Sequence, residues 1–449
     1  MVKYWRENGV NIVLYLDDGL GMDEGYKNCK DTSEFVKSSL KLAGFIVNEE
    51  KSIFEPVQCL EWLGLIWDSK DFTLKVPERR IKDTKNSLDI ILKSFSNLNA
   101  RMLAQFAGRI ISMSPVMGNV TNLMTRHIYF AIENRKTWDS KLYLVYEKCV
   151  LAELKFWQEN LLELNEKRLL NDSLPRIMIY SDASNVALGA YTVESNEKIF
   201  HCMLNENEKK LSSTWRELRA IQLSLNSFEH DLKCKIVKWH TDNQNCVNII
   251  NKGSTKLHLQ HLAYDIFRTC TRSGITLCPT WIPRCENFKA DFISKMVDID
   301  DWQTSFQFFT FMNEIWGPYT IDRFANFHNT KLKRFNSKFW NPGSTAIDAF
   351  AQNWTMENNW MVPPISLVAK SIKHLILCRA EGTLIVPKWP SSAFWSLIFN
   401  RRLEFQPYVI EVLDFSSGQN IFVQGQNKNS IFGTKHFKSD ILAIKMKAT

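Results

Sequence analysis

The first part of the chain alternates between short apolar runs and a longer amphipathic stretch. Residues 11–16 (NIVLYL) predict a buried strand, and residues 23–44 predict a helix that ends at a glycine suited to a C-terminal cap. Three short strands are expected next, over 45–54, 59–68 and 72–76. This pattern indicates a small mixed α/β region.

Helical spacing takes over after Pro77 and continues to about residue 165. The apolar positions that define the first of these helices are Ile81, Leu88, Ile91, Leu92 and Phe95. Residues 171–175 (NDSLP) are typical of a linker, and an α/β pattern then returns up to about Lys295. A Trp- and Phe-rich segment follows. We therefore expect an α/β and α+β multidomain protein with divisions at 1–76, 77–170, 172–296 and 297–449.

Composition narrows the class of protein. A chain of 449 residues with 45% apolar content is long enough to bury several cores and is not typical of disorder. The net charge of +8 permits a polyanionic partner without requiring one. The 10 cysteines form no CxxC pair, and no apolar run approaches the ~20 residues of a membrane span. We expect an intracellular protein, cytoplasmic or nuclear, with no membrane partner; no oligomeric state is favoured.

Four acidic residues lie at the ends of predicted strands or on predicted helices between residues 172 and 296. Asp182 ends one apolar strand and Asp242 another, Glu217 borders an apolar helical stripe, and Asp291 lies near the start of a helix. If the two strands are neighbours, their carboxylates meet at one edge of the sheet. Any one of these acids alone is more typical of a surface or capping residue. Together they indicate divalent cations, because Mg²⁺ prefers oxygen ligands and two ions can catalyse phosphodiester hydrolysis.

The short sequence motifs around these acids resemble those of a known enzyme family. SDAS followed by GAY, then WREL, TDN and Asn287-x-x-Ala-Asp resemble, in order, the four acidic motifs of type 1 RNase H. The resemblance implies a mixed sheet with flanking helices that cleaves the RNA strand of an RNA–DNA hybrid through two Mg²⁺ ions. It assigns catalysis and metal binding to Asp182, Glu217, Asp242 and Asp291. Many members carry a mobile His before the last acid, and the loop TWIPRCENFKAD has none.

The tetrapeptide YLDD at 15–18 has two interpretations, a polar hairpin turn or a divalent-metal site. With RNase H motifs downstream it resembles the YxDD box of reverse transcriptases, which implies a catalytic, metal-binding role for Asp17 and Asp18. Residues 42–52 resemble a palm segment, 61–68 the primer grip, and the basic helix after Pro77 the thumb. The nucleic-acid contacts that follow are Lys51, Trp62, Gly64, Arg79, Arg80, Lys82 and Lys85. The basic residues of this helix have an equally weighted alternative interpretation, an ordinary solvent-exposed face that contacts no phosphate backbone.

The chain departs from the reverse transcriptase pattern in one respect. The palm also needs an Asp on an earlier strand and the fingers, and neither precedes Asp17 in this sequence. We therefore expect no DNA polymerisation by this chain, although a full-length parent would polymerise. The sequence is consistent with a piece of a longer gene product.

Residues 316–400 resemble the Dam-like methyltransferase domain of DIRS-like, tyrosine-recombinase retrotransposons. The Asx-Pro-Pro-aromatic box of that family is replaced here by VPPI at 362–365. Aliphatic side chains can neither bind the target amino group nor stack on a flipped base, so S-adenosylmethionine chemistry is not expected. A nucleic-acid-binding appendage and an aromatic-rich structural domain are the remaining interpretations.

Two functional hypotheses remain for the whole chain. The first is a retrotransposon reverse transcriptase fragment whose RNase H domain cuts RNA–DNA hybrids and whose other regions hold template–primer nucleic acid. The second is a non-catalytic nucleic-acid-binding module from a decayed or co-opted element. The complete set of four acids favours the enzyme.

Overall fold

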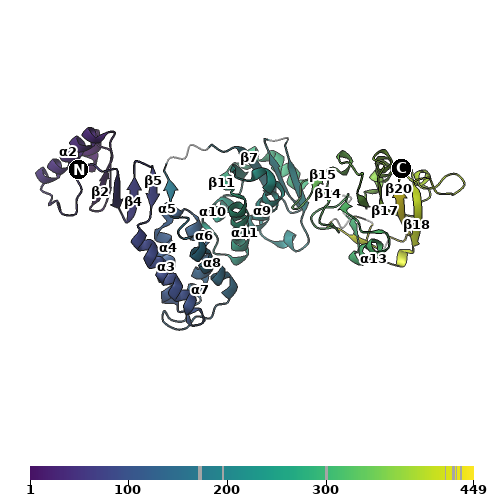
Figure 1. Cartoon of the computed structure of the whole chain (residues 1–449), viewed down its shortest axis with the longest axis horizontal. Coiled ribbons are helices and arrows are strands. Elements are labelled where there is room, and N and C mark those ends of the chain that lie inside the picture. The colour runs from purple at the N-terminus through teal and green to yellow at the C-terminus, as the bar shows by residue number, and fades with distance from the viewer. Residues whose placement is uncertain are drawn as a thin grey trace. The chain divides into compact units, whose positions relative to one another are not determined.

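The computed structural model describes residues 1–448 except 170–173, 195–196, 299–301, 420, 427–429, 431 and 435–436. The chain forms two compact units, residues 1–172 and 173–449, each of mixed α/β structure (Figure 1). The linker predicted at 171–175 lies largely outside the described residues. Within the described part of the chain, no helix has the length and hydropathy needed to cross a bilayer. The finer division into four domains stays a prediction.

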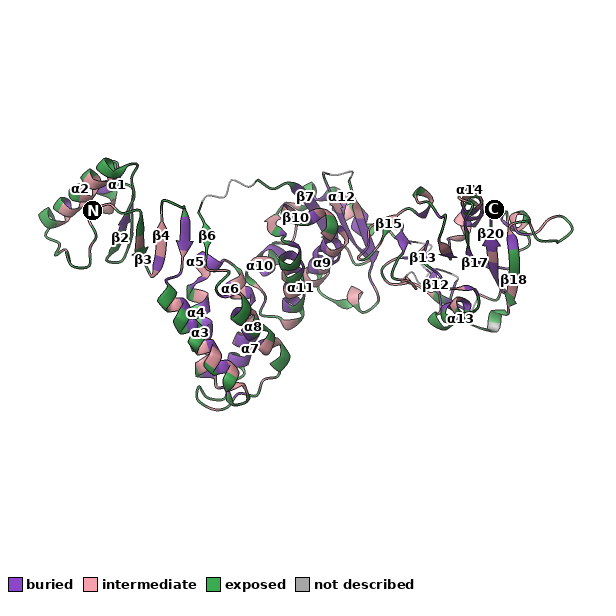
Figure 2. Cartoon of the chain, in the orientation of Figure 1, coloured by how far each residue is buried: buried purple, intermediate pink, exposed green. Residues whose placement is uncertain are grey.

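The first unit begins with a helix and a two-stranded hairpin. These elements are α1 (Val2–Glu7), β1 (Ile12–Tyr15) and β2 (Asp18–Gly21). The strand predicted at 11–16 is present, but the prediction that it is buried is wrong, since only its first residue is shielded (Figure 2). The reason is that β1 pairs only with β2 among the described residues, and the core beneath is small.

Helix α2 (Tyr26–Leu42) follows, close to the range predicted for it. The strand predicted at 45–54 is wrong, since no described residue of that segment is in a strand. Its polar centre forms a turn, where the Glu49 carboxylate lies 3.3 Å from the Lys37 ammonium and 2.6 Å from that of Lys41. Ion pairing to α2 therefore replaces strand pairing.

A four-stranded antiparallel sheet comes next in the first unit. Its strands are β3 (Cys59–Trp62), β4 (Leu65–Asp68), β5 (Thr73–Lys75) and β6 (Lys167–Arg168). The segment 59–68, which the apolar pattern predicts as one strand, is a hairpin of two, in agreement with the strand pair that its resemblance to a primer grip implies. The turn falls at Leu63 and Gly64, both of which have positive φ, 49° and 69°.

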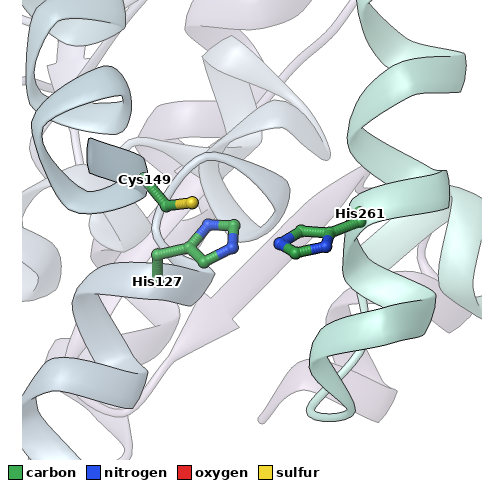
Figure 3. Close-up of side chains that lie close together, drawn as sticks. All are labelled: His127, Cys149 and His261. Carbon is green, nitrogen blue, oxygen red and sulfur yellow. The ribbon is translucent and has the colours of Figure 1, made fainter. Parts of the chain in front are cut away.

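Helices make up the rest of this unit, as the periodicity predicts. They are α3 (Glu78–Lys93), α4 (Ala100–Ser112), α5 (Ser114–Met117), α6 (Val120–Leu123), α7 (Arg126–Glu133) and α8 (Glu147–Asn160). A buried carboxylate, that of Glu153 on α8, accepts hydrogen bonds from the backbone amides of His127 and Ile128 and contacts the His127 ring at 2.7 Å. Figure 3 shows His127 beside Cys149 of α8. His261, also drawn there, belongs to helix α11 (Leu257–Ser273) of the second unit. His127 and Glu153 thus fasten α7 to α8.

The second unit contains a five-stranded mixed sheet in the order β11-β10-β7-β8-β9. Its strands are β7 (Ile177–Ala183), β8 (Ala187–Thr192), β9 (Ile199–Met203), β10 (Ile236–Thr241) and β11 (Thr276–Trp281). The helices in this stretch are α9 (Ser213–Leu232), α10 (Gln244–Lys252), α11 (Leu257–Ser273) and α12 (Phe288–Lys295). Strand β10 runs parallel to both β7 and β11, whereas β7, β8 and β9 are antiparallel.

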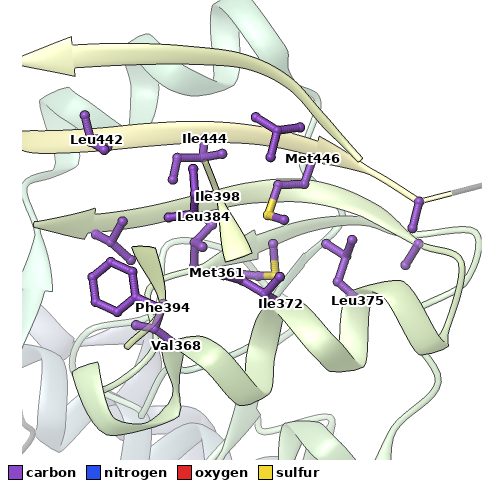
Figure 4. Close-up of a cluster of buried hydrophobic side chains, with 14 of the residues drawn as sticks. Met361, Val368, Ile372, Leu375, Leu384, Phe394, Ile398, Leu442, Ile444 and Met446 are labelled. Atoms are coloured by element: carbon purple, nitrogen blue, oxygen red, sulfur yellow. The ribbon is translucent and has the colours of Figure 1, made fainter. Parts of the chain in front are cut away.

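The remainder of the second unit is built on a second five-stranded sheet, in the order β13-β16-β17-β20-β18. These strands are β13 (Ile321–Asp322), β16 (Asn358–Met361), β17 (Glu381–Pro387), β18 (Val409–Phe415) and β20 (Ile441–Lys447). Two short pairs accompany them, β12 (Trp302–Thr304) with β19 (Phe422–Gln424) and β14 (Asn336–Ser337) with β15 (Ala346–Ile347). Helices α13 (Phe306–Trp316) and α14 (Val368–Leu377) complete the fold, and Figure 4 shows the apolar side chains between α14 and the sheet.

Candidate active site

Parallel pairing brings two of the predicted acids to the same place. Strands β7 and β10 are hydrogen-bonded neighbours in parallel register, so Asp182 near the end of β7 and Asp242 just after β10 lie at the same edge of the sheet. Helix α9 packs against β7 and presents Glu217 to them. One carboxylate oxygen from each of the three residues lies within 4.8 Å of the others. This arrangement is the one expected from neighbouring strands.

Burial makes the three carboxylates costly to ionise together. Asp182 is 4% exposed and Glu217 is 5% exposed, while Asp242 is half-buried. Burial raises the pKa of Asp182, and the charges of Asp242 and Asp291 add to that effect. Burial and the charges of Asp182 and Asp242 raise the pKa of Glu217 well above its ordinary value. Burial is also the main cause of the raised pKa of Asp242.

The group fits a divalent cation on its own chemistry. All three donors are hard carboxylate oxygens, the ligands that Mg²⁺ prefers. Glu217 Oε2 is buried without a hydrogen-bond partner among the described residues. A buried acceptor left unsatisfied costs about 1–3 kcal/mol, so this oxygen is placed to accept a ligand rather than to stabilise the fold alone.

Neighbouring side chains hold the carboxylates in place. Ser294 Oγ of α12 donates a hydrogen bond of 2.5 Å to Asp182 Oδ2. The indole N–H of Trp281 donates to the backbone oxygen of Asp242 at 3.0 Å. Gly189 on β8 lies opposite Asp182 in the ladder, and a Cβ at this position would come 2.6 Å from the backbone nitrogen of Ser294. Only glycine allows α12 to approach β8 closely enough for the serine to reach Asp182.

Asp291, the fourth predicted acid, differs from the other three. It lies in the first turn of α12, as predicted, but it is not part of the three-carboxylate group. Arg284 Nη2 contacts its Oδ1 at 2.9 Å and Lys295 Nζ contacts its Oδ2 at 2.5 Å. These contacts, with Lys295 the larger cause, lower its pKa. Asp291 therefore lies between two cations, and its assignment to metal binding and catalysis stays a prediction.

Several residues that shape this site escaped the sequence analysis. They are Gly189, Trp281, Arg284, Ser294 and Lys295. Part of the signal was local, because Ser294 and Lys295 follow Asp291 at i+3 and i+4 on one helix and must lie near it. The approach of Ser294 to Gly189 depends on the packing of α12 on β8 and has no local signal.

The YLDD pair has a different setting in the first unit. Leu16 and Asp17 form the turn between β1 and β2, and Asp18 is the first residue of β2. Both aspartates are exposed. In the described part of the chain, no group of three potential metal ligands includes either residue. The hairpin-turn interpretation agrees with the structure, whereas the metal-site interpretation stays a prediction.

Some of the residues predicted to contact nucleic acid form hydrogen bonds or ion pairs within the first unit, and others are exposed. Arg80 donates to the carbonyl of Gly64 at 2.7 Å and to Ser112 Oγ at 2.7 Å, and Arg79 pairs with Glu61. These two arginines therefore tie α3 to its surroundings within the unit.

The other predicted contacts lie on the surface or pack locally. Lys51 is exposed in the turn that follows α2, and Trp62 is half-buried with its ring 5.9 Å from that of Trp67. Lys82 and Lys85 on α3 are exposed, and neither forms a salt bridge within the described residues. Like Lys93 at the end of α3, the two lysines are open to a polyanion.

Comparison with known proteins gives a family similarity for the segment that carries this site. The family model described as the RNase H-like domain found in reverse transcriptase matches residues 172–266, which include Asp182, Glu217 and Asp242. No curated protein matches the chain. The matched segment is similar to the RNase H-like domains of reverse transcriptases.

Solved structures give more distant likenesses. The foamy viral protease–reverse transcriptase in complex with RNA/DNA hybrid has 13% identity and a TM-score of 0.34, covering 68% of this chain and 41% of that one. RNase H1 from the archaeon Halobacterium salinarum NRC-1 has 17% identity and a TM-score of 0.22, covering 26% and 92%. LC11-RNase H1 in complex with RNA/DNA hybrid has 19% identity and a TM-score of 0.23, covering 26% and 93%. The chain spans less than half the length of the foamy viral chain.

Proposed function

We propose that the second unit hydrolyses the RNA strand of RNA–DNA hybrids in a divalent-metal-dependent reaction, as an RNase H of type 1. The observation that carries the proposal is the convergence of Asp182, Glu217 and Asp242 at one edge of the sheet within 4.8 Å. The family match over residues 172–266 supports it. RNA/DNA hybrid is also the ligand of the foamy viral and LC11 structures.

The three clustered carboxylates would hold Mg²⁺, with Asp291 bordering them. Bound divalent ions supply activation of the attacking water and stabilisation of the leaving oxygen. The chain's own part is positioning: Ser294 fixes one oxygen of Asp182, and Trp281 fixes the backbone that carries Asp242. Lys295 and Arg284 lower the pKa of Asp291, and the exposed Arg284 would place a cation where the phosphate backbone of a substrate approaches.

In the wider proposal, the chain is a reverse transcriptase/RNase H fragment of a DIRS-like retrotransposon. The first unit would contribute phosphate contacts through Lys82 and Lys85, and its YLDD hairpin would not act in polymerisation by this chain. Primer extension with dNTPs and Mg²⁺ is the test of the second statement. The expected result is no extension, and any templated product would contradict it.

The direct test of the nuclease is cleavage of an RNA–DNA hybrid labelled on the RNA strand, in Mg²⁺ and in EDTA. We expect metal-dependent RNA cleavage that Asp182→Asn abolishes. Asp231→Asn is a matched control, because Asp231 pairs with Lys198 in the same unit and is not part of the acid group. Tight hybrid binding without cleavage would support the non-catalytic binding module instead.

A further inference from the structure

Three large aromatic side chains are exposed around the acid group. Phe288 and Phe292, both on α12, are 72% and 67% exposed, and Trp281 at the end of β11 is 47% exposed. Side chains so open to water bury little core surface, so they contribute little to the stability of the second unit. Isolated exposed rings need no explanation, whereas contiguous ones are typical of interaction sites.

Helix α12 makes two of these rings contiguous and places them beside Asp291. The opposite face of the helix is buried and packs on β7 and β8. Residues three or four positions apart are neighbours on a helix surface. Phe288 therefore neighbours both Asp291 and Phe292, and the two phenylalanines form one apolar patch that begins at the fourth predicted acid.

Cations lie at both ends of the phenylalanine patch. Arg284 precedes Phe288 by four residues and Lys295 follows Phe292 by three, and both cations are exposed. They share a single carboxylate, that of Asp291, at 2.9 Å and 2.5 Å. Because one negative charge lies between two positive charges, the cations keep part of their attraction for an anion.

The ligand that fits this patch is an unpaired nucleic acid strand. Flat rings interleaved with cations bind such strands, because the bases stack on the rings while the phosphates lie near the cations. A base inside a duplex already has a neighbour on each face, so it offers no free face to a phenylalanine. The patch therefore fits unpaired nucleotides at the end of a paired segment rather than the interior of a duplex.

We propose that Phe288 and Phe292 stack on unpaired nucleotides that border an RNA–DNA hybrid, on either the RNA or the DNA strand. The phosphates of these nucleotides would lie near Arg284 and Lys295. The adjoining paired segment would then reach the acid group, a consequence that rests on the proposed nuclease, whereas the stacking itself does not. The two phenylalanines would be positioning residues that select junctions between paired and unpaired nucleic acid.

The test is fluorescence anisotropy of labelled RNA–DNA hybrids titrated with the full chain in EDTA, which prevents metal-dependent cleavage. The hybrids share one duplex. One end is blunt, carries about four unpaired RNA or DNA nucleotides, or carries the same number of abasic nucleotides, which keep the phosphates and remove the bases. We expect at least one base-carrying flank to bind about tenfold more tightly than the blunt and abasic ends. The tighter of the two identifies the strand that contacts α12.

Substitutions assign this preference to the two rings. Phe288→Ala/Phe292→Ala should bind every flanked hybrid like the abasic one, and the exposure of both residues leaves the core intact. Phe288→Tyr/Phe292→Tyr keeps the flat rings and should keep the preference. Phe306→Ala is the matched control, because Phe306 is 66% exposed at the start of another helix of the same unit, α13. If the alanine variant fails to fold, the comparison of base-carrying with abasic flanks in wild type decides.

Three outcomes would overturn the proposal. They are equal affinity of wild type for base-carrying and abasic flanks, a preference that survives in the folded alanine variant, and self-association of wild type that the variant loses in sedimentation velocity. The last result would make the patch an interface between copies of the chain. Since the binding assay contains no metal, failure to cleave in Mg²⁺ would refute the nuclease and leave the stacking result unchanged.

Discussion

The aspartates of the first and second units share their chemistry and differ in their surroundings. Asp17 and Asp18 lie exposed at a two-stranded hairpin, whereas Asp182 is buried near the end of the central strand of a five-stranded sheet. The second setting adds Glu217 from a helix and Asp242 from a neighbouring strand, and burial raises the pKa of each. Adjacent acids in the sequence are therefore weaker evidence for a metal site than acids that separate elements bring together.

The largest expected difference between the two sets of acids is in how far an alanine at the neighbouring glycine changes the free energy of unfolding. Gly189→Ala would force a Cβ against the backbone of Ser294, so we expect a loss of about 1–3 kcal/mol in the unfolding free energy of the second unit. A Cβ at Gly19, next to Asp18, would come closest to the flexible side-chain end of Leu14, at 2.7 Å, with its other neighbours at 3.9 Å or more. Gly19→Ala should therefore change stability by less than about 0.5 kcal/mol. Urea denaturation measures both, and equal effects would refute the close-packing argument.

The second contrast is the pH dependence of stability without metal. A carboxyl whose pKa is raised in the folded state contributes stability that is complete below its unfolded value and is lost as pH rises through the folded value. In EDTA, the unfolding free energy of the second unit should therefore fall as pH rises above about 4. Mg²⁺ should restore it, since a ligand of the folded state stabilises that state.

Two substitutions assign that pH dependence. Glu217→Gln removes a buried titrating group, so it should flatten the profile in EDTA. Asp17→Asn should leave the profile unchanged. A wild-type unfolding free energy in EDTA that does not fall as pH rises above about 4 would show that ionising the buried acid group does not destabilise the fold.

A smaller effect is expected at the cations around Asp291. Arg284→Gln removes an exposed positive charge from the border of the acid group, which should lower the Mg²⁺ concentration needed for half-maximal cleavage about two- to fivefold. The matched control is Lys289→Gln on α12, where the lysine pairs with Glu197. A higher Mg²⁺ requirement in Arg284→Gln would show instead that the arginine assists metal binding.

The smallest effect concerns the basic helix of the first unit. Each phosphate contact adds about 1 to the slope of log K against log salt, so Lys82→Gln should reduce the slope for hybrid binding by about 1. Arg79→Gln should change it less, because that arginine already pairs with Glu61. Equal slopes for wild type and Lys82→Gln would favour an ordinary solvated face for α3.

Sequence patterns were most informative where elements are long and regularly periodic. The strands that carry Asp182 and Asp242 and the helix that carries Glu217 follow from apolar patterning, and their convergence follows from parallel pairing. The failures have physical causes. Residues 45–54 form ion pairs with α2 instead of a strand, and β1 is exposed because β2 is its one strand partner among the described residues. The contact of Ser294 with Asp182 joins residues 112 positions apart, which no local pattern reveals.

The most direct test of the account compares the two sets of aspartates in one cleavage assay. RNA–DNA hybrid is incubated in Mg²⁺ with wild type, with Asp182→Asn, and with the double variant Asp17→Asn/Asp18→Asn. We predict that Asp182→Asn reduces RNA cleavage more than about 100-fold, beyond the 10–100-fold typical of residues that only support a metal ligand. The double variant should cleave like wild type. Cleavage that survives Asp182→Asn, or that is lost with Asp17 and Asp18, would contradict the assignment of the active site to the second unit.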